Sequence, residues 1–336
     1  MLAVSIEPNM NYRSVGDLSQ LISHSMHKIP RDAEIIVGIP RSGMLTASII
    51  ALKANLPLTD LYSFLRNDEL RRGKTRSYKL SHLVHPQDAR KILLVDDSVS
   101  TGSSLAEAKG RLKEFIAAGG EVVTLAAYAE RRSGDLVDIH FDLVGHPRMF
   151  EWNVMHHPRL IDACMDIDGV LCVDPTEEEN DDGPRYLEFI NNARPLIIPT
   201  IKVKRLVTSR LEKYRQPTEA WLARHGVQYG SLHMVDLPSA GERRRLKIHH
   251  KFKANVYASD IESTLFVESE PGQAIEIMRR TNKPVYCTED NQMYVPGVSI
   301  GSISVKAGRK AIRIRSKVLN RVRALRRKLH GLLVNG

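Results

Sequence analysis

The chain has 336 residues, with 49 Lys or Arg against 39 Asp or Glu, and a formal net charge of +10 at pH 7. Eleven basic residues and no acidic ones lie between residues 306 and 328, so the rest of the chain carries −1. This distribution argues against a basic nucleic-acid-binding domain and places the excess charge in a C-terminal tail.

Other bulk features indicate an intracellular protein. No apolar run approaches the roughly 18 residues of a membrane span, and the N-terminus lacks the basic-then-apolar pattern of a secretory leader. The three cysteines, Cys164, Cys172 and Cys287, form no CxxC pair, so we expect buried, reduced thiols. We therefore expect a cytoplasmic protein, of a length that suits two domains.

Short β-rich runs alternate with helix-like stretches in the first half of the chain. The runs expected to form buried strands are residues 34–39, 91–95, 121–129 and 141–145, and the expected intervening helices are 44–52 and 104–117. This alternation predicts an α/β domain with a parallel sheet.

A second series begins at residue 162 and predicts another α/β unit. It contains β-rich runs at 162–172, 203–210, 255–259, 263–268 and 284–287, with a helix-like run at 218–226. The polar segment 156–159, with Pro158, separates the two series. The predicted organisation is two Rossmann-like parallel-sheet domains, 1–156 and 159–300, followed by a basic amphipathic helix within 301–336.

The run KILLVDDSVSTGSS, residues 91–104, combines a buried strand, two adjacent acids, a hydroxyl-rich loop and a helix start. Backbone amides at a helix N-terminus can cradle a monophosphate, and Asp96 and Asp97 can accept hydrogen bonds from vicinal sugar hydroxyls. The sequence therefore predicts a site for a 5-phosphorylated pentose. The expected loop contacts are Val99, Ser100, Thr101, Gly102, Ser103 and Ser104. An ordinary turn with solvated acids is the alternative.

This run resembles the phosphoribosyl pyrophosphate (PRPP) motif of type I phosphoribosyltransferases. The resemblance implies attack at C1 of PRPP as Mg²⁺-bound pyrophosphate leaves, with Asp96 and Asp97 compensating the positive charge on the ribose ring. VGIPRSGMLTA, residues 37–47, resembles the pyrophosphate loop of the same family. The implied pyrophosphate contacts are Arg41, Ser42 and Gly43.

Two further segments have expected roles at this first site. Residues 65–80 are polar and basic, as expected of a loop that closes over pyrophosphate with Arg71, Arg72, Lys74 and Arg76. A solvated loop without that role is the alternative. Trp152 follows the last predicted strand and is the candidate acceptor contact, unless it serves only in packing.

In MDIDGVLC, residues 165–172, two carboxylates lie two positions apart at the end of an apolar strand. They can therefore face the same side. The run resembles motif one of the haloacid dehalogenase-like (HAD-like) phosphatases. The resemblance implies that Asp166 attacks phosphorus, that Asp168 is the general acid and base, and that the Asp168 carbonyl binds Mg²⁺.

Three later runs match the remaining motifs of that family in order. RLVTSR supplies Thr208 for the phosphoryl oxygens, and KFKANVY supplies Lys253, with Lys251 as the alternative. STLFVESE offers Glu268 and Glu270 as Mg²⁺ ligands, where the family commonly has aspartates. The alternative is an inactive domain kept as a scaffold.

Together the two resemblances imply transfer of phosphoribosyl followed by removal of its 5-phosphate. The predicted function is a two-step ribofuranosyltransferase acting on a saccharide, for example a lipid-linked glycan. The alternatives are a nucleobase phosphoribosyltransferase with a nucleotidase, or a PRPP-sensing regulator that binds nucleic acid.

The basic tail bears on this choice. An apolar stripe at 318, 322, 325, 329 and 332 predicts an amphipathic helix, so residues 306–333 can contact anionic lipid or dock on protein. The tail has no aromatic residue beyond Arg309, which disfavours single-strand nucleic acid as a partner.

Overall fold

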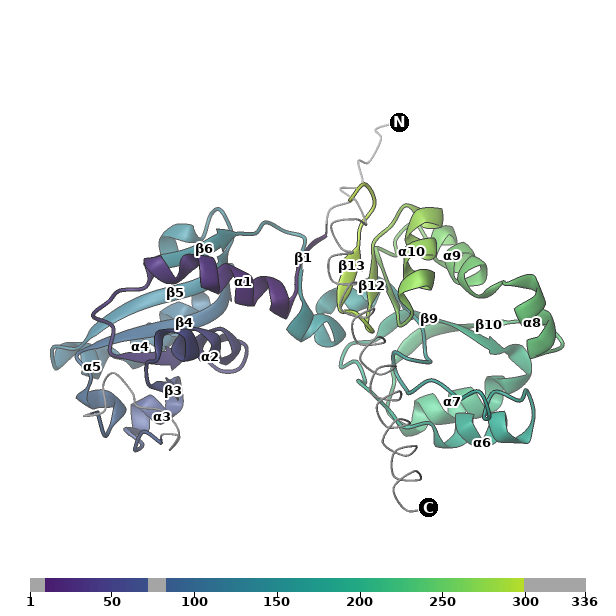
Figure 1. The fold of residues 1–336 in the computed structure, drawn as a ribbon, viewed down its shortest axis with the longest axis horizontal. Helices are drawn as coiled ribbons and strands as arrows, with labels where there is room; N and C mark the ends of the chain where they lie inside the picture. The colour runs from purple at the N-terminus through teal and green to yellow at the C-terminus, as the bar shows by residue number, and fades with distance from the viewer. Residues whose placement is uncertain (1–9, 72–82, 299–336) are drawn as a thin grey trace, which may run out of the picture.

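The computed structural model describes residues 10–71 and 83–298. Figure 1 shows two α/β units, each built around its own sheet, with strand β1 (Asn11–Arg13) between them. The basic tail and residues 72–82 of the expected closing loop lie outside the described residues.

The first unit is a parallel five-stranded sheet in the order β3-β2-β4-β5-β6. The strands are β2 (Ile35–Gly38), β3 (Leu58–Asp60), β4 (Lys91–Val99), β5 (Glu121–Ala129) and β6 (Ile139–Leu143). Helices α1 (Val15–Ser25) and α2 (Gly43–Ala54) pack on one face of the sheet, and α3 (Leu61–Arg66) and α4 (Ser103–Arg111) pack on the other. The short helix α5 (Lys113–Ala117) follows α4. Because β2 and β4 are parallel neighbours, their carboxyl ends lie side by side at the same end of the sheet.

The second unit is a six-stranded sheet in the order β10-β9-β8-β11-β12-β13, parallel except for the last pair. Its strands are β8 (Ala163–Met165), β9 (Val203–Leu211), β10 (Tyr229–Val235), β11 (Leu265–Glu268), β12 (Val285–Cys287) and β13 (Gln292–Tyr294). Helices α6 (Pro184–Asn192) and α7 (Arg215–Arg224) cover one face, and α9 (His249–Ser259) and α10 (Pro271–Thr281) cover the other. Helix α8 (Ala240–Leu246) precedes α9.

The α/β class and the parallel sheets are confirmed, but individual elements differ from the prediction. Residues 255–259, expected among the β-rich runs, end helix α9, where Tyr257 is fully buried against Phe266. The expected helix 104–117 is two helices, because the chain changes course at Leu112 between α4 and α5. The three cysteines are free and buried, as expected.

A small third sheet joins the ends of the first unit. Strand β1 pairs in parallel with β7 (Arg148–Phe150), and short 3-10 turns at Glu151–His156 and Pro158–Asp162 lead into β8. Tyr12 of β1 reaches the second unit, where its hydroxyl donates to the Asn291 carbonyl oxygen at 2.9 Å and its ring lies 5.7 Å from that of Tyr286.

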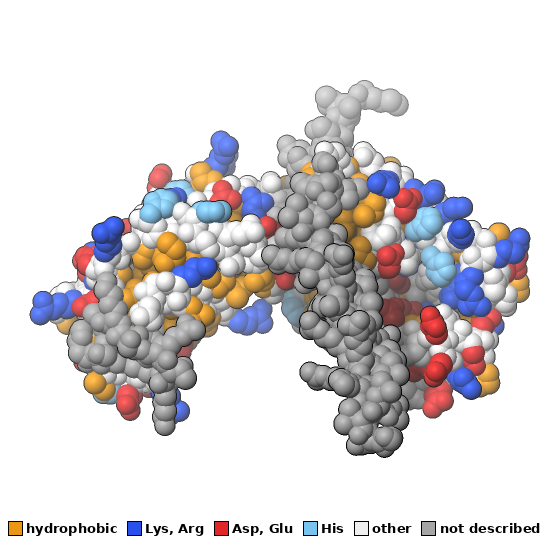
Figure 2. Space-filling view, viewed as in Figure 1, with side chains coloured by type: hydrophobic (Ala, Val, Ile, Leu, Met, Phe, Trp, Pro, Cys, Tyr) orange, Lys and Arg blue, Asp and Glu red, His pale blue; other side chains and the backbone are white. Residues whose placement is uncertain are grey.

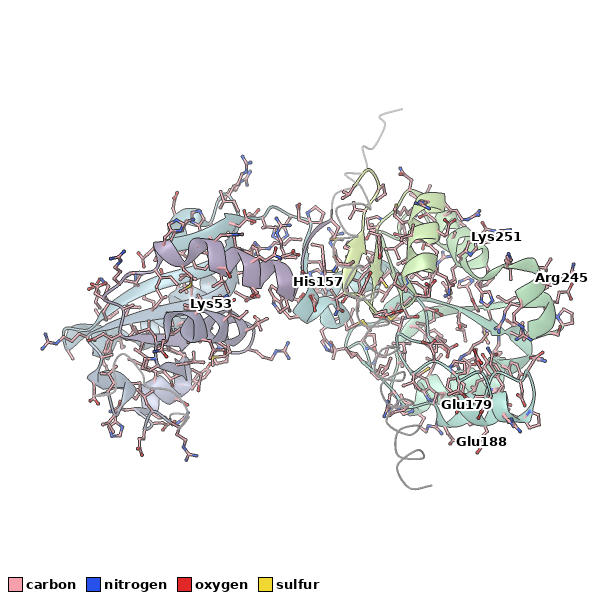
Figure 3. All side chains as sticks on the ribbon, in the orientation of Figure 1. Lys53, His157, Glu179, Glu188, Arg245 and Lys251 are labelled. Atoms are coloured by element: carbon pink, nitrogen blue, oxygen red, sulfur yellow. The ribbon has the colours of Figure 1, made fainter. Side chains whose placement is uncertain are left out.

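The visible surface of the described residues is of mixed polarity. Figure 2 shows basic and acidic side chains interspersed over the second unit, and Figure 3 places Arg245 and Lys251 on its outer side. Within residues 10–71 and 83–298, no helix combines the length and apolar character needed to cross a membrane.

Candidate active sites

The acid pair stands near the carboxyl end of β4. Asp97 is 5% exposed and Asp96 is partly exposed, and the Asp97 amide donates to Oδ1 of Asp96 at 2.9 Å. Burial, and then the neighbouring Asp97 charge, raises the pKa of Asp96 to about 7. Two carboxylates held this close are suited to stabilise positive charge that develops next to them.

Both oxygens of Asp97 bind side chains from other segments. Ser42, at the start of α2, donates its hydroxyl to Oδ1 at 2.8 Å, and the Trp152 indole Nε1 donates to Oδ2 at 2.8 Å. The Trp152 ring stacks on Phe150, with centroids 4.9 Å apart and an interplanar angle of 8°. The structure thus brings together the predicted pyrophosphate loop, the acid pair and the candidate acceptor contact.

The loop after β4 turns sharply into α4. Gly102 has a φ of +76°, and a Cβ there would lie 2.7 Å from Cδ1 of Leu136, so the position favours glycine. The hydroxyls of Thr101 and Ser103 lie 2.9 Å apart. The loop therefore presents hydroxyls and helix N-terminal amides on an exposed surface, as a monophosphate site requires.

The second unit has an acid–lysine–acid cluster near the ends of its central strands. Lys253 of α9 is 2% exposed, and its Nζ lies 2.5 Å from Oδ2 of Asp166 and 2.7 Å from Oε2 of Glu268. Burial lowers the pKa of Lys253, but the two carboxylates outweigh it and raise the pKa above its ordinary value. Lys251 is exposed on the outer side of α9 (Figure 3), so Lys253 is the lysine at this cluster.

Asp168 is held by an arginine that the sequence did not single out. Arg210 of β9 is fully buried and donates from Nε and Nη2 to the Asp168 carboxylate, with the shortest distance 2.6 Å. Its Nη1 also donates to Thr218 at 3.3 Å. A two-point guanidinium contact fixes the orientation of the carboxylate.

The remaining predicted residues of this site differ in placement. Thr208 is fully buried, and its neighbour Ser209 lines the cavity. Glu270 also borders the cavity, but its carboxylate accepts from the amides of Gly272 and Gln273 and caps α10. In the part of the chain that the structure describes, no three acidic, histidine or cysteine side chains form a ready metal-binding group.

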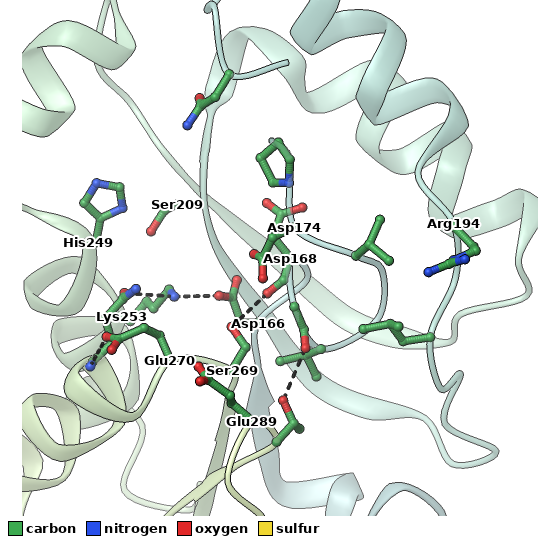
Figure 4. Close-up of a pocket in the computed structure, with 18 of the residues that line it drawn as sticks. Asp166, Asp168, Asp174, Arg194, Ser209, His249, Lys253, Ser269, Glu270 and Glu289 are labelled. Atoms are coloured by element: carbon green, nitrogen blue, oxygen red, sulfur yellow. Dashed lines mark hydrogen bonds and ion pairs between the residues drawn. The ribbon is translucent and has the colours of Figure 1, made fainter. Parts of the chain in front are cut away.

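The cluster opens into a cavity of about 980 Å³. Figure 4 shows Asp166, Asp168 and Asp174 at its centre, Ser209 and His249 on the side of Lys253, and Arg194 on the opposite side. Burial, followed by the charges of Arg243 and Lys253, lowers the pKa of His249 to about 4, so this imidazole is neutral at pH 7. The carboxylates at the centre of the cavity thus lie between Lys253 on one side and Arg194 on the other.

Comparison with known protein families identifies the first unit. Residues 6–158 match the family described as "Phosphoribosyl transferase domain". This part of the chain is a phosphoribosyltransferase domain. A search of curated proteins finds no significant match to the chain.

Solved structures of phosphoribosyltransferases are also similar to this chain. Xanthine-guanine-hypoxanthine phosphoribosyltransferase of Helicobacter pylori is 18% identical, covers 44% of this chain and 93% of its own, and gives a TM-score of 0.32. Purine phosphoribosyltransferase of Pyrococcus horikoshii is 15% identical, with coverages of 43% and 94% and a TM-score of 0.31. Adenine phosphoribosyltransferase of Saccharomyces cerevisiae is 14% identical, with coverages of 39% and 77% and a TM-score of 0.24.

Gly43 of the phosphoribosyltransferase domain packs directly against the acid pair. A Cβ at Gly43 would lie 2.8 Å from the Val95 carbonyl oxygen and 3.0 Å from Oδ1 of Asp96. We expect Gly43→Ala to move the start of α2 or the Asp96 carboxylate. Because small displacements of positioning groups cost up to about 100-fold in rate, we expect PRPP affinity or transfer to fall on the order of 10- to 100-fold.

Isothermal titration with PRPP checks this expectation. Gly110→Ala in α4 is the matched control, because the Cβ it adds meets no atom within 4 Å apart from its chain neighbours and the backbone of its own helix. PRPP affinity and transfer that stay at wild-type level in Gly43→Ala would show that the contact with Asp96 tolerates the methyl group.

Proposed function

We propose that the chain is a two-step ribofuranosyltransferase. The first step moves 5-phosphoribosyl from PRPP to a saccharide hydroxyl with release of pyrophosphate, and the second hydrolyses the 5-phosphate. The observation that carries the proposal is one chain in which a phosphoribosyltransferase domain precedes a cavity with a carboxylate–lysine–carboxylate cluster. The first reaction would leave a 5-phosphate on the transferred ribose. The carboxylate–lysine–carboxylate cluster is suited to remove such a phosphate.

In the proposed first step, the β4 loop binds the 5-phosphate and the acids face the ribose. Ser42 links the pyrophosphate loop to Asp97 at 2.8 Å, so the two ends of PRPP would be bound by elements in direct contact. Asp96 is the more exposed acid and would compensate charge on the ribose ring as the bond to pyrophosphate breaks.

For the second step we propose a HAD-like phosphatase unit spanning residues 159–300. The order of the strands supports it, because β8, which leads to Asp166, lies between β9 and β11. Asp166 would attack phosphorus, and the expelled sugar oxygen would take a proton from Asp168. Water would then give a proton to Asp168 and attack the acyl phosphate, which releases inorganic phosphate and restores both aspartates. Lys253 would hold the nucleophile and the phosphoryl charge together.

The donors beside Asp166 are of the chemical type that Mg²⁺ prefers, and in the structure Lys253 contacts both carboxylates. The Asp166 and Glu268 carboxylates and the Asp168 carbonyl supply only oxygen, which Mg²⁺ prefers. Burial, then the charges of Asp168 and Glu268, raises the pKa of Asp174, which lines the same cavity. We propose that Asp166, Asp168 and Glu268 hold Mg²⁺, which would polarise the phosphoryl oxygens.

The acceptor distinguishes the leading proposal from its rival. A cavity of about 980 Å³ has room for a phosphorylated ribose attached to a further sugar. The stacked rings of Phe150 and Trp152 beside Asp97 also suit a nucleobase, which favours a phosphoribosyltransferase and nucleotidase as the second candidate. Peripheral contact of residues 306–333 with anionic lipid remains a proposal from the sequence.

Mass spectrometry of full-length protein with PRPP and Mg²⁺ tests the acceptor class. We expect lipid-linked glycans to gain one ribosyl group without phosphate, and nucleobases to remain unchanged. Ribosylation of a nucleobase alone would replace the saccharide acceptor by the second candidate.

A further inference from the structure

Arg243 is a buried cation whose contacts in the described structure are all neutral. It lies on α8, is 5% exposed and borders the cavity next to Asp166. Its Nη1 donates to the Ser209 carbonyl oxygen, and its side chain also hydrogen-bonds Tyr186. Its Nε has no hydrogen-bond partner, and among residues 10–71 and 83–298 no carboxylate forms an ion pair with it.

The other fully buried cations of this unit are neutralised. Arg210 binds Asp168, and Lys253 binds both Asp166 and Glu268. A buried charge without a counter-charge is costly. The contrast indicates that the anion for Arg243 comes from a ligand of the cavity.

A second unpaired donor stands next to Arg243. The Ser209 hydroxyl oxygen is buried, lines the same cavity and has no hydrogen-bond partner. Figure 4 places Ser209 and His249 on the Lys253 side of the cavity. Arg243 and Ser209 therefore both have unpaired donors on the wall beside Lys253, and an anion with several oxygens can accept from both.

We propose that Arg243 and Ser209 bind the non-bridging oxygens of a phosphate monoester and hold its phosphorus next to Asp166. This inference rests on the proposed phosphatase step and names its phosphate-binding residues. It adds to the predicted pair of Thr208 and Lys253 an arginine that the sequence did not single out. The sugar part of the substrate would extend toward the rest of the cavity.

Binding of inorganic phosphate to full-length protein with Mg²⁺, followed by calorimetry, tests the proposal without turnover. Arg243→Met should weaken phosphate binding at least about 10-fold, because it removes charge-assisted hydrogen bonds to the phosphate oxygens. Ser209→Ala should weaken it by a smaller factor. Arg244→Met is the matched control, since Arg244 is the exposed neighbour on the same helix, and its phosphate affinity should be unchanged.

A second variant keeps the test usable if the first one does not fold. If Arg243→Met does not fold by circular dichroism, Arg243→Lys keeps the charge but loses the fork geometry, and it should still bind phosphate several-fold more weakly than wild type. Wild-type phosphate affinity in the folded Arg243 variant overturns the inference. Phosphate binding that depends on Arg243 in a protein that hydrolyses no phosphate ester would instead refute the proposed phosphatase step and leave this site standing.

Discussion

Asp166→Asn should stop the second reaction and leave the first intact, so that a 5-phosphoribosylated acceptor accumulates. The amide cannot form the acyl phosphate, and loss of a covalent nucleophile lowers turnover by at least about 1000-fold. The fold should survive, because Lys253 keeps its ion pair with Glu268 at 2.7 Å and is not left as an unpaired buried charge. Mass spectrometry of the acceptor and release of inorganic phosphate measure the two outcomes separately.

A matched variant tests whether the effect belongs to the nucleophile. Asp181→Asn changes an exposed acid of the β8–β9 connection and should give the fully dephosphorylated product. If Asp166→Asn also releases phosphate at the wild-type rate, the order of steps proposed above is wrong, and the cavity serves another substrate.

Replacing Asp96 and Asp97 by asparagine should have the complementary effect. Both acids of the proposed ribose site lose their negative charge. Asparagine at position 97 also keeps only one of the two oxygens that accept from Ser42 and Trp152. Removal of charge stabilisation of this kind lowers rates by about 100- to 1000-fold, so transfer from PRPP should become undetectable while phosphate ester hydrolysis stays at wild-type rate. Pyrophosphate release measures the first and phosphate release the second.

The raised pKa of Asp96 predicts the pH dependence of the same step. Its carboxylate takes up a proton as the pH falls below about 7, and the charge that would stabilise the ribose ring is then lost. Transfer by wild-type protein should therefore decline toward acidic pH. Asp135→Asn, which changes an exposed acid, is the control and should keep both the rate and the pH profile.

Mixing the two full-length variants completes the test. Asp166→Asn supplies the phosphorylated intermediate, and the Asp96 and Asp97 variant supplies the hydrolytic site. The mixture should yield the ribosylated product with release of inorganic phosphate. A mixture that accumulates the intermediate unchanged would show that the second site does not act on it.

The sequence was sufficient to predict those site features whose residues lie close together in the chain. Asp96 and Asp97 follow a continuous apolar run, and the hydroxyl-rich loop follows them, so strand, acids and helix start could be recognised from residues 91–104 alone. The Asp166 and Asp168 pair was visible for the same reason. Strand β10 was missed because polar residues interrupt its apolar pattern, and β1 because three residues carry too little periodicity.

Side-chain contacts between residues far apart in the chain could not be predicted from the sequence. Arg210 lies 42 positions from Asp168, and nothing in VTSR indicates that its guanidinium turns inward. Arg243 lies in a run of three arginines, a pattern typical of a solvated surface, and only the packing of α8 shows that the first of them is buried. The pairing of Trp152 with Asp97 likewise spans 55 positions.

The hydrogen bond from Trp152 to Asp97 makes the intrinsic fluorescence of Trp152 a probe of the first site. The chain contains two tryptophans, and the other, Trp221, is 1% exposed, with its Nε1 bound to the Ala193 carbonyl oxygen in the second unit. In a Trp221→Phe background, intrinsic fluorescence would come from Trp152 alone. The fluorescence emission of an indole depends on the charge of the group that accepts its N–H hydrogen bond. Stopped-flow fluorescence would therefore follow ligand binding next to Asp97 in real time. The measurement needs neither labelled PRPP nor a known acceptor.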